Sequence, residues 1–294
     1  MKEYIKQFIN EYDCPEECGA VLLSAYDRLS EYAEFNSLVD EYYIDNKIPI
    51  FRDVIEKLSQ KIGIHEFTGY GVLFVCISKQ TKEVCRKWNW DDDMFRRGML
   101  DIKYHFLECF ECHKVWGVPA PGWITGIVTG DVVSLGRMQF LIKTYNGEDV
   151  PIGEHILKKG TKYIDAHIPG SGEPFDENTR MDAYEKAYKY FGNVSGDGPC
   201  FFGCESWLLF PPNKEILDPK SNIVSFMNEF TVVKETIFEE SEILRDAWRV
   251  FGYVEDGTPY ENLPEKSSLQ RAYKKWLLDG NLLGMGMGFK AYPH

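Results

Sequence analysis

The stretch CFECHKVWG, residues 109 to 117, places Cys109, Cys112 and His113 at the spacing that attaches haem covalently in c-type cytochromes. That attachment requires export of the chain. The N-terminal residues MKEYIKQFINEY mix charges with apolar residues at helical spacing and contain neither an apolar core nor a small-residue cleavage site. We therefore expect no bound haem and a cytoplasmic location.

The surroundings of the same stretch indicate a helix. Residues 91 to 117 begin with three aspartates, continue with apolar residues at helical spacing and end at Gly117. Cys109 then fills a helix core. A zinc site is the alternative, and it would need two more ligands, for which Cys14 and Cys18 are the clustered candidates. We expect structural thiols and no metal.

A second segment with possible chemistry is YIDAHIPGSGEPFDENTRMDAYEKAYKYF, which reads as a strand, a glycine-containing loop and a helix. Gly170, Ser171 and Gly172 would bring free backbone N–H groups and the positive end of a helix dipole to one place, where an anion can bind. Asp176 and Glu177 near the helix start compete for the same positive end. A purely structural turn is the alternative interpretation.

The composition is that of a globular protein. The 294 residues are 44% hydrophobic and 27% charged, a length that favours two domains. The formal net charge of -13 argues against nucleic acid or an anionic membrane as partner, because phosphates normally bind to a basic surface. Eight cysteines in a reducing compartment are not expected to form disulfides.

The expected elements change in type after GVPAPG, residues 117 to 122. Residues 1 to 117 show helical periodicity and predict an all-helical N-terminal domain. Residues 118 to 294 alternate between strand and helix patterns and predict a mixed sheet flanked by helices, so the fold class is α+β. The expected strands are residues 123–136, 137–145, 163–169, 199–210, 231–238 and a glycine-rich last strand at 281–292.

Five motifs in the C-terminal half carry a family resemblance: SLGRMQFLI, HIPGSGEPF, CESWLLFPP, SNIVSFMNEF and GMGMGF. In this order they resemble bacterial acyltransferase-domain proteins that join a helical N-terminal acyltransferase domain to a C-terminal domain of the GNAT superfamily fold. The resemblance implies a GNAT-like core that uses acetyl-CoA or another acyl-CoA as co-substrate and transfers the acyl group to an amine of a small molecule or peptide. The usual pyrophosphate loop of the superfamily is missing, and HIPGSGEPF stands in its place.

The resemblance also implies site residues. In the GNAT fold the strand ending at His167 and the strand holding Glu205 splay apart around the pantetheine arm. His167 suits the general base, because histidine ordinarily titrates near a pKa of about 6.5. Glu205 is the other option, since burial in an apolar strand would raise its pKa. Ser206 could protonate the leaving thiolate, and backbone N–H groups could stabilise the oxyanion.

The implied ligand contacts follow the same fold. The CoA-binding residues would be Ile168, Gly170, Ser171, Gly172 and Arg180, and the substrate pocket would include Cys204, Trp207 and Arg137.

Each of these assignments has a structural alternative. His167 can be a hydrogen-bonded core histidine, Glu205 can pair with an arginine such as Arg137, and Trp207 can be a core residue. Cys204 could also act as a nucleophile, although a buried thiol is usually inert. For the whole protein, the alternative is a non-catalytic module that keeps the fold for ligand binding or interaction.

Overall fold

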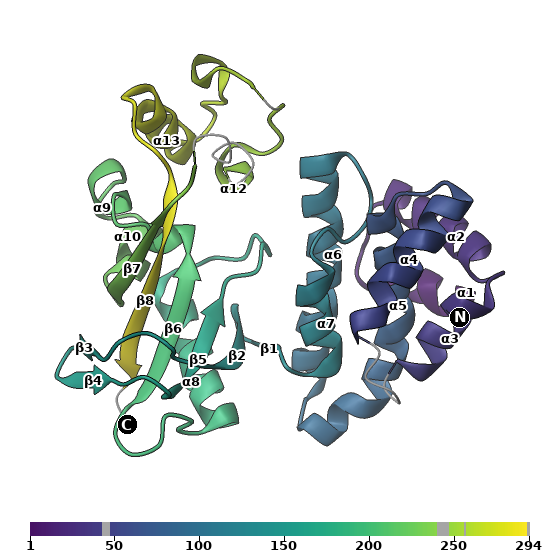
Figure 1. Ribbon diagram of the computed structural model, residues 1–294, viewed down its shortest axis with the longest axis horizontal. Helices are drawn as coiled ribbons and strands as arrows, with labels where there is room; N and C mark the ends of the chain where they lie inside the picture. Colours follow the sequence, from purple (N-terminus) through teal and green to yellow (C-terminus); the bar gives the residue numbers. More distant parts are fainter. Residues whose placement is uncertain (43–47, 240–246, 256, 293–294) are drawn as a thin grey trace. The chain divides into compact units, whose positions relative to one another are not determined.

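The computed structural model describes residues 1–42, 48–239, 247–255 and 257–292. Contacts divide the chain into two compact units. One consists of Met1–Ser134 with the short segment Pro169–Gly172, and the other of Leu135–Ile168 with Glu173–His294. The fold class is α+β, as the sequence predicts, with helices first and a mixed sheet after them (Figure 1).

The first unit is helical. Its helices are α1 (Lys2–Glu11), α2 (Glu16–Leu29), α3 (Ala33–Glu41), α4 (Ile48–Ile62), α5 (Glu66–Val84), α6 (Asp92–His113) and α7 (Pro121–Thr129). The central helix is α5, which packs against all the others in this unit (Figure 1). Its middle, from Thr68 to Ser78, is buried all round. Small residues allow this close packing: a Cβ on Gly69 would lie 2.5 Å from the Ser59 hydroxyl oxygen of α4.

The CFECH segment is the last part of α6, and its assignment to a helix is confirmed. Asp91 caps the helix, with its carboxylate accepting the Met94 N–H at 2.8 Å. Cys109 is fully buried, and burial raises the pKa of its thiol to about 12. The helix ends at His113 rather than Gly117, because Lys114 adopts a left-handed conformation at φ 55°. In the described ranges, no group of three or more His, Cys, Asp or Glu residues is arranged to hold a metal ion.

The predicted strand at 123–136 is wrong over most of its length, because Pro121–Thr129 forms α7. The β-branched residues suggested a strand, but Ile124, Ile127 and Val128 are buried at helical spacing. Pro121 suits a first turn, and Gly130 ends the helix at φ 83°. Since α7 packs against α5 and α6, residues 118–134 group with the helical unit, past the predicted boundary at 117.

The chain forms a sheet whose strand order is β1-β2-β5-β6-β8-β7, and all of its strands except β1 lie wholly in the second unit. The strands are β1 (Val133–Leu135), β2 (Met138–Thr144), β5 (Lys162–His167), β6 (Cys200–Ser206), β7 (Thr231–Ile237) and β8 (Gly284–Tyr292). Strands β5 and β6 are parallel, whereas β2–β5, β6–β8 and β7–β8 are antiparallel. The mixed sheet is therefore confirmed.

The two faces of this sheet are covered differently. On one face, Tyr184 of helix α8 (Glu177–Phe191) contacts the rings of Phe140 and Phe202. On the other face, the hairpin of β3 (Val150–Ile152) and β4 (His155–Leu157) buries Ile152 and Leu157 with residues of β5, β6 and β8. The sequence pattern predicted helices as the flanking elements and missed this short hairpin.

The remaining elements form a second core beside the sheet. They are η2 (Trp207–Leu209), α9 (Asn213–Ile216), α10 (Asn222–Met227), α12 (Trp248–Phe251), η4 (Tyr260–Asn262) and α13 (Ser268–Leu278). Asn213 is fully buried and joins them, since its side-chain amide donates to the Trp207 carbonyl at 2.9 Å and its oxygen accepts from the Tyr273 hydroxyl at 2.5 Å. None of the helices in the described part of the chain combines the length and apolar character that a membrane crossing needs.

Candidate functional site

The parallel strands β5 and β6 stop pairing before they end. Their register pairs are Ile164 with Phe202 and Asp165 with Gly203, and each strand continues beyond this point. His167 and Glu205 each lie two residues past the last pair, so alternation places them on one face of the sheet. The two strands are neighbours in the sheet (Figure 1). The expected splay of the two strands thus fits their pairing.

A chain of three charged or ionisable side chains lies at this end of β5. Asp165 is buried, with 3% of its side chain exposed, and its Oδ2 atom is 2.7 Å from Nε2 of His167. The same Oδ2 atom is 2.6 Å from Nζ of Lys143 on β2, whose side chain is 43% exposed. The His167 side chain is 28% exposed. One carboxylate oxygen therefore contacts both a histidine and a lysine.

The contact between Asp165 and His167 has a chemical consequence for the imidazole ring. An ionised carboxylate only accepts hydrogen bonds, so Nε2 of His167 carries the proton that is shared with Asp165. In the neutral ring the lone pair that can accept a proton is then on Nδ1. A buried carboxylate that holds a histidine in this way fixes its tautomer and leaves Nδ1 able to accept a proton.

Glu205 shares the face of His167 and Asp165 but differs in environment. Its side chain is exposed, so the burial on which the sequence argument relied is absent. Its charge still acts on its neighbours: burial raises the pKa of Tyr163, and the carboxylates of Asp165 and Glu205 raise it further. Glu205 is therefore a solvated carboxylate near the end of the strand pair.

Ser206 and Cys204 are on the opposite face of β6 from His167 and Glu205 by the same alternation. The Ser206 oxygen accepts the Leu208 N–H at 3.2 Å and caps the turn η2. Cys204 is buried, and burial raises the pKa of its thiol well above the usual range. This placement removes Cys204 from the expected substrate pocket and supports the inert-thiol alternative over the nucleophile.

Trp207 follows β6 in the turn η2, where the predicted strand has already ended. Its ring packs edge-on against Tyr273 at 6.0 Å and belongs to the second core of the unit. The core alternative for Trp207 therefore agrees with its surroundings.

The glycine loop after β5 has mixed features. Gly172 has a left-handed φ of 71° with open space around its Cα, as close approach of a ligand to the backbone requires. Gly170 is less open, since a Cβ there would lie 2.7 Å from the Glu108 carboxylate. At the start of α8, the Asp176 carboxylate already accepts the Thr179 N–H at 2.9 Å. The Glu108 carboxylate thus lies beside Gly170, in the loop on which the resemblance places CoA phosphates.

The two arginines named from the sequence have different surroundings. Arg137 precedes β2, and its Nε donates to the Glu173 carbonyl at 3.1 Å rather than to Glu205. Its guanidinium lies 5.5 Å from the Phe175 ring centre. Arg137 therefore packs on the segment between the glycine loop and α8.

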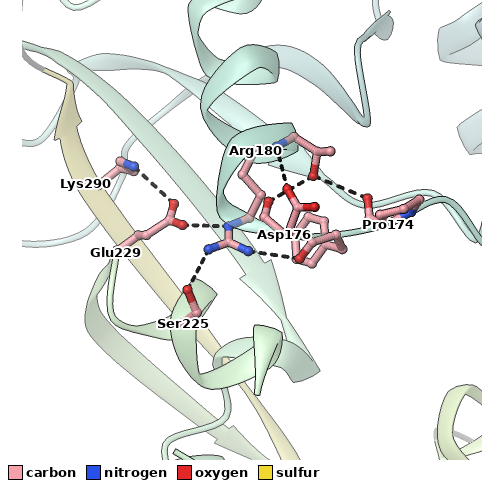
Figure 2. A network of polar contacts seen from close by, with 8 residues as sticks. Pro174, Asp176, Arg180, Ser225, Glu229 and Lys290 are labelled. Carbon is pink, nitrogen blue, oxygen red and sulfur yellow. Dashed lines mark hydrogen bonds and ion pairs between the residues drawn. The ribbon is translucent and has the colours of Figure 1, made fainter. Parts of the chain in front are cut away.

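Arg180 of α8 is fully buried, and Figure 2 shows its guanidinium surrounded by protein acceptors. It donates to the Glu229 carboxylate at 2.6 Å, the Ser225 hydroxyl at 2.9 Å and the Phe175 carbonyl at 3.0 Å. Lys290 of β8 contacts the other Glu229 oxygen at 3.2 Å. A guanidinium committed in this way cannot reach a phosphate, so we exclude Arg180 from the CoA site.

Sequence reasoning missed Asp165 and Lys143. A signal was present, because Asp165 and His167 are i and i+2 in an otherwise apolar strand and so share a face. Lys143 could not be linked to them without the register of β2 on β5, in which Leu141 opposes Asp165 and Lys143 opposes Tyr163.

Comparisons with known proteins agree with this architecture. Among solved structures, an acyltransferase mutant in complex with octanoyl-CoA matches with a TM-score of 0.76 at 18% identity, covering 99% of this chain and 88% of that one. An acyltransferase in complex with decanoyl-CoA and teicoplanin matches with a TM-score of 0.73 at 18% identity, covering 98% and 87%. At this identity the likeness establishes a shared fold.

A search of curated proteins finds no match. The family model of the GNAT-like C-terminal domain matches residues 132–290, which include β1 to β7 and most of β8. The chain therefore belongs to the family of proteins with a GNAT-like C-terminal domain.

Proposed function

We propose that the protein is an acyl-CoA-dependent N-acyltransferase, with His167 as general base. The observation that carries this proposal is the end of the β5–β6 pairing at Asp165 and Gly203, with a histidine bonded to a buried carboxylate immediately beyond it. In the GNAT fold the acyl thioester lies where these two strands separate. A base at this point is placed to act on an amine that attacks the thioester.

The proposed reaction is a direct transfer. A neutral amine attacks the thioester carbonyl carbon, and the carbon–nitrogen bond forms while the carbonyl oxygen takes up negative charge. Nδ1 of His167 removes a proton from the nitrogen, and collapse of the intermediate breaks the carbon–sulfur bond. The thiolate takes up a proton, so the products are an amide and free CoA. Backbone N–H groups at the point where the strands separate would stabilise the oxyanion.

Glu205 is the alternative base, because it shares the face of His167. Glu205 is exposed and, within the described residues, is not held in place by a buried partner, whereas His167 is fixed by its hydrogen bond to Asp165. His167 is therefore the better supported base. The opposite-face position of Ser206 and its bond to Leu208 N–H leave the protonation of the thiolate to the His167 imidazolium or to solvent.

The substrates are proposed from the fold neighbours. The matching acyltransferases hold octanoyl-CoA or decanoyl-CoA, and one also holds teicoplanin. We infer that this chain accepts an acyl-CoA with a medium-length chain and an amine on a peptide-like acceptor. CoA phosphates would bind the backbone of Ile168 and of the Gly170–Gly172 loop, the segment that takes the place of the usual pyrophosphate loop.

The test is turnover by the full chain. Acetyl-, octanoyl- and decanoyl-CoA are incubated with a panel of peptide and small-molecule amines, release of CoA thiol is followed with a chromogenic disulfide, and amide products are identified by mass. His167→Gln should lower kcat by roughly 10²- to 10⁴-fold while CoA affinity is retained, the size of a lost general base. Full activity of His167→Gln together with an inactive Glu205→Gln would move the base to Glu205.

The non-catalytic alternative has its own supporting observation, the Glu108 carboxylate beside Gly170 in the expected phosphate loop. It predicts that calorimetry detects no CoA binding, or detects binding without turnover for every acyl-CoA and amine in the panel.

A further inference from the structure

The unusual feature of the candidate site is that Lys143 and His167 contact the same carboxylate oxygen. Oδ2 of Asp165 is 2.6 Å from the lysine Nζ and 2.7 Å from the histidine Nε2, and the carboxylate is almost fully buried. The His167 ring and the Asp165 carboxylate are sufficient to fix the tautomer of the histidine. The third, a lysine from the neighbouring strand, requires an explanation.

We propose that Lys143 is a positioning residue that acts through Asp165: its ammonium neutralises the buried carboxylate and so keeps His167 in the neutral form that can accept a proton. This inference rests on the proposed function, in which His167 is the base, and it adds the residue that sets the pH range in which that base works.

The physical reason is charge compensation. A buried carboxylate facing a histidine attracts a proton to the ring, because an opposite charge within about 4 to 6 Å favours the charged form by about 1 to 3 pH units. An imidazolium has no lone pair and cannot act as a base. With Lys143 in contact, the lysine and aspartate together are neutral, and Asp165 still accepts the Nε2 hydrogen and fixes the ring. The orientation of the His167 ring is thus kept, while the electrostatic attraction of Asp165 for a second proton on that ring is reduced.

Other groups around Asp165 do not supply this neutralisation. On the same face lie Tyr163 of β5 and Glu205 of β6, and Gln139 of β2 is the register partner of His167. Cys204 is on the other face, with its pKa raised by burial and next by Asp165, while Lys143 lowers it. Among these neighbours the charged ones are acidic or become negative when they ionise. Among the residues that the structure describes, Lys143 is the lysine or arginine that contacts Asp165.

The position of Lys143 also permits a clean test. Its side chain is partly exposed, so a methionine of similar length should replace it without opening a cavity. Lys143→Arg retains the positive charge. Lys162 is an exposed lysine on β5, opposite Thr144 in the register, and Lys162→Met removes one positive charge from the same sheet outside this cluster.

The first experiment measures the protonation of His167 directly. The imidazole C–H resonances of the full chain are titrated by NMR, and the His167 signal is identified by its absence in His167→Gln. We expect Lys143→Met to raise the midpoint of this signal by about one pH unit. Lys143→Arg and Lys162→Met should leave it unchanged, and Asp165→Asn should lower it. An unchanged midpoint in Lys143→Met, or an equal rise in Lys162→Met, would overturn the proposal.

The second experiment follows activity. In kcat/KM for the acyl acceptor, the acid limb should move to higher pH in Lys143→Met by the same amount as the NMR midpoint, with the plateau at high pH retained. Asp165→Asn should lose roughly 10²-fold or more at every pH, because an amide can donate to Nε2 and reverse the tautomer. If the protein proves inactive with every substrate, the proposed function fails, whereas the NMR midpoints still decide the role of Lys143.

Discussion

Replacement of Glu229 by glutamine should be among the most destabilising single changes in the second unit. Glu229 is the anion of a cluster with two cations, Arg180 and Lys290 (Figure 2). The Arg180 side chain is fully buried, and those of Glu229 and Lys290 are each 13% exposed. Glutamine keeps the shape and one acceptor but removes the charge, so both cations lose their counter-ion in a poorly solvated place.

The magnitude follows from the geometry. Removing one partner of a buried ion pair costs about 3 to 5 kcal/mol, because the remaining charge stays buried and uncompensated. Lys290 can escape part of this cost by losing its proton, since burial already lowers its pKa. Arg180 cannot lose its proton, and with glutamine at position 229 its guanidinium is left with uncharged acceptors, among them the Ser225 hydroxyl and the Phe175 carbonyl. A loss of this size corresponds to roughly 6 to 20 °C in Tm for a domain of this length.

The assay is thermal and urea unfolding of the full chain, followed by circular dichroism and by protection from proteolysis. Lys290→Met should cost less than Glu229→Gln, because the pair of Arg180 and Glu229 is left intact and neutral. Lys186→Met, which breaks an exposed ion pair with Asp182 on α8, serves as the control and should cost about 0.5 kcal/mol or less. A Tm of Glu229→Gln equal to that of the control would refute the argument that this cluster stabilises the unit.

Further outcomes are expected at other positions. Gly286→Ala should destabilise by about 3 kcal/mol in urea unfolding, because the new Cβ would lie 2.1 Å from a backbone carbonyl oxygen of the turn after β6. Partial desolvation lowers the pKa of His113 from 6.5 although the side chain is largely exposed, so the unfolded chain binds its proton more readily. Stability should fall slightly as the pH drops below about 6.5, and His113→Asn should remove that small part of the decrease in a pH series of melting curves. Gly172→Val should abolish the rise in Tm caused by CoA, whereas Gly160→Val, at φ 86° in an equally open turn, should preserve it. Purified protein should show no Soret absorbance and no stoichiometric iron or zinc by elemental analysis, and a metal at unit occupancy would contradict the structural role of the CFECH cysteines.

Much of the fold could be predicted because local signals agree with tertiary packing. Asp176 was placed near the start of the helix that follows the glycine loop, and its carboxylate caps α8 by accepting the Thr179 N–H. The sequence predicts a glycine-rich last strand, which β8 confirms, and the turn η2 lies so close to Gly286 that no side chain fits there. The prediction of a strand over the residues of α7 was wrong. The β-branched residues of this segment favour a strand, and its helical spacing becomes decisive only once the segment packs on α5 and α6.

The candidate site was less predictable, because function here depends on which strands are neighbours. His167 and Glu205 were found through the family resemblance, and the end of β5–β6 pairing agrees with their expected positions. For Arg180, in contrast, the structure does not agree with the role that the resemblance implies. An arginine in the first turn of a helix after a glycine loop reads as a phosphate ligand, yet this one is used entirely in the core. Sequence cannot separate these roles, since both need a cation at the same place in the helix.

The proposed role of Lys143 depends on the register of β2 on β5, and local packing fixes that register. Lys143 opposes Tyr163, and the Tyr163 ring lies over Gly203, where any Cβ would come within 2.5 Å of it. A slip of one residue would turn Lys143 toward the α8 face, where Phe140 and Phe202 pack, and would bring Ile142 to the face of Asp165. The slip would leave the buried Asp165 carboxylate without its cation, which is unfavourable. The hydrophobic pattern that folds the sheet therefore also places the three side chains on which the proposed base depends.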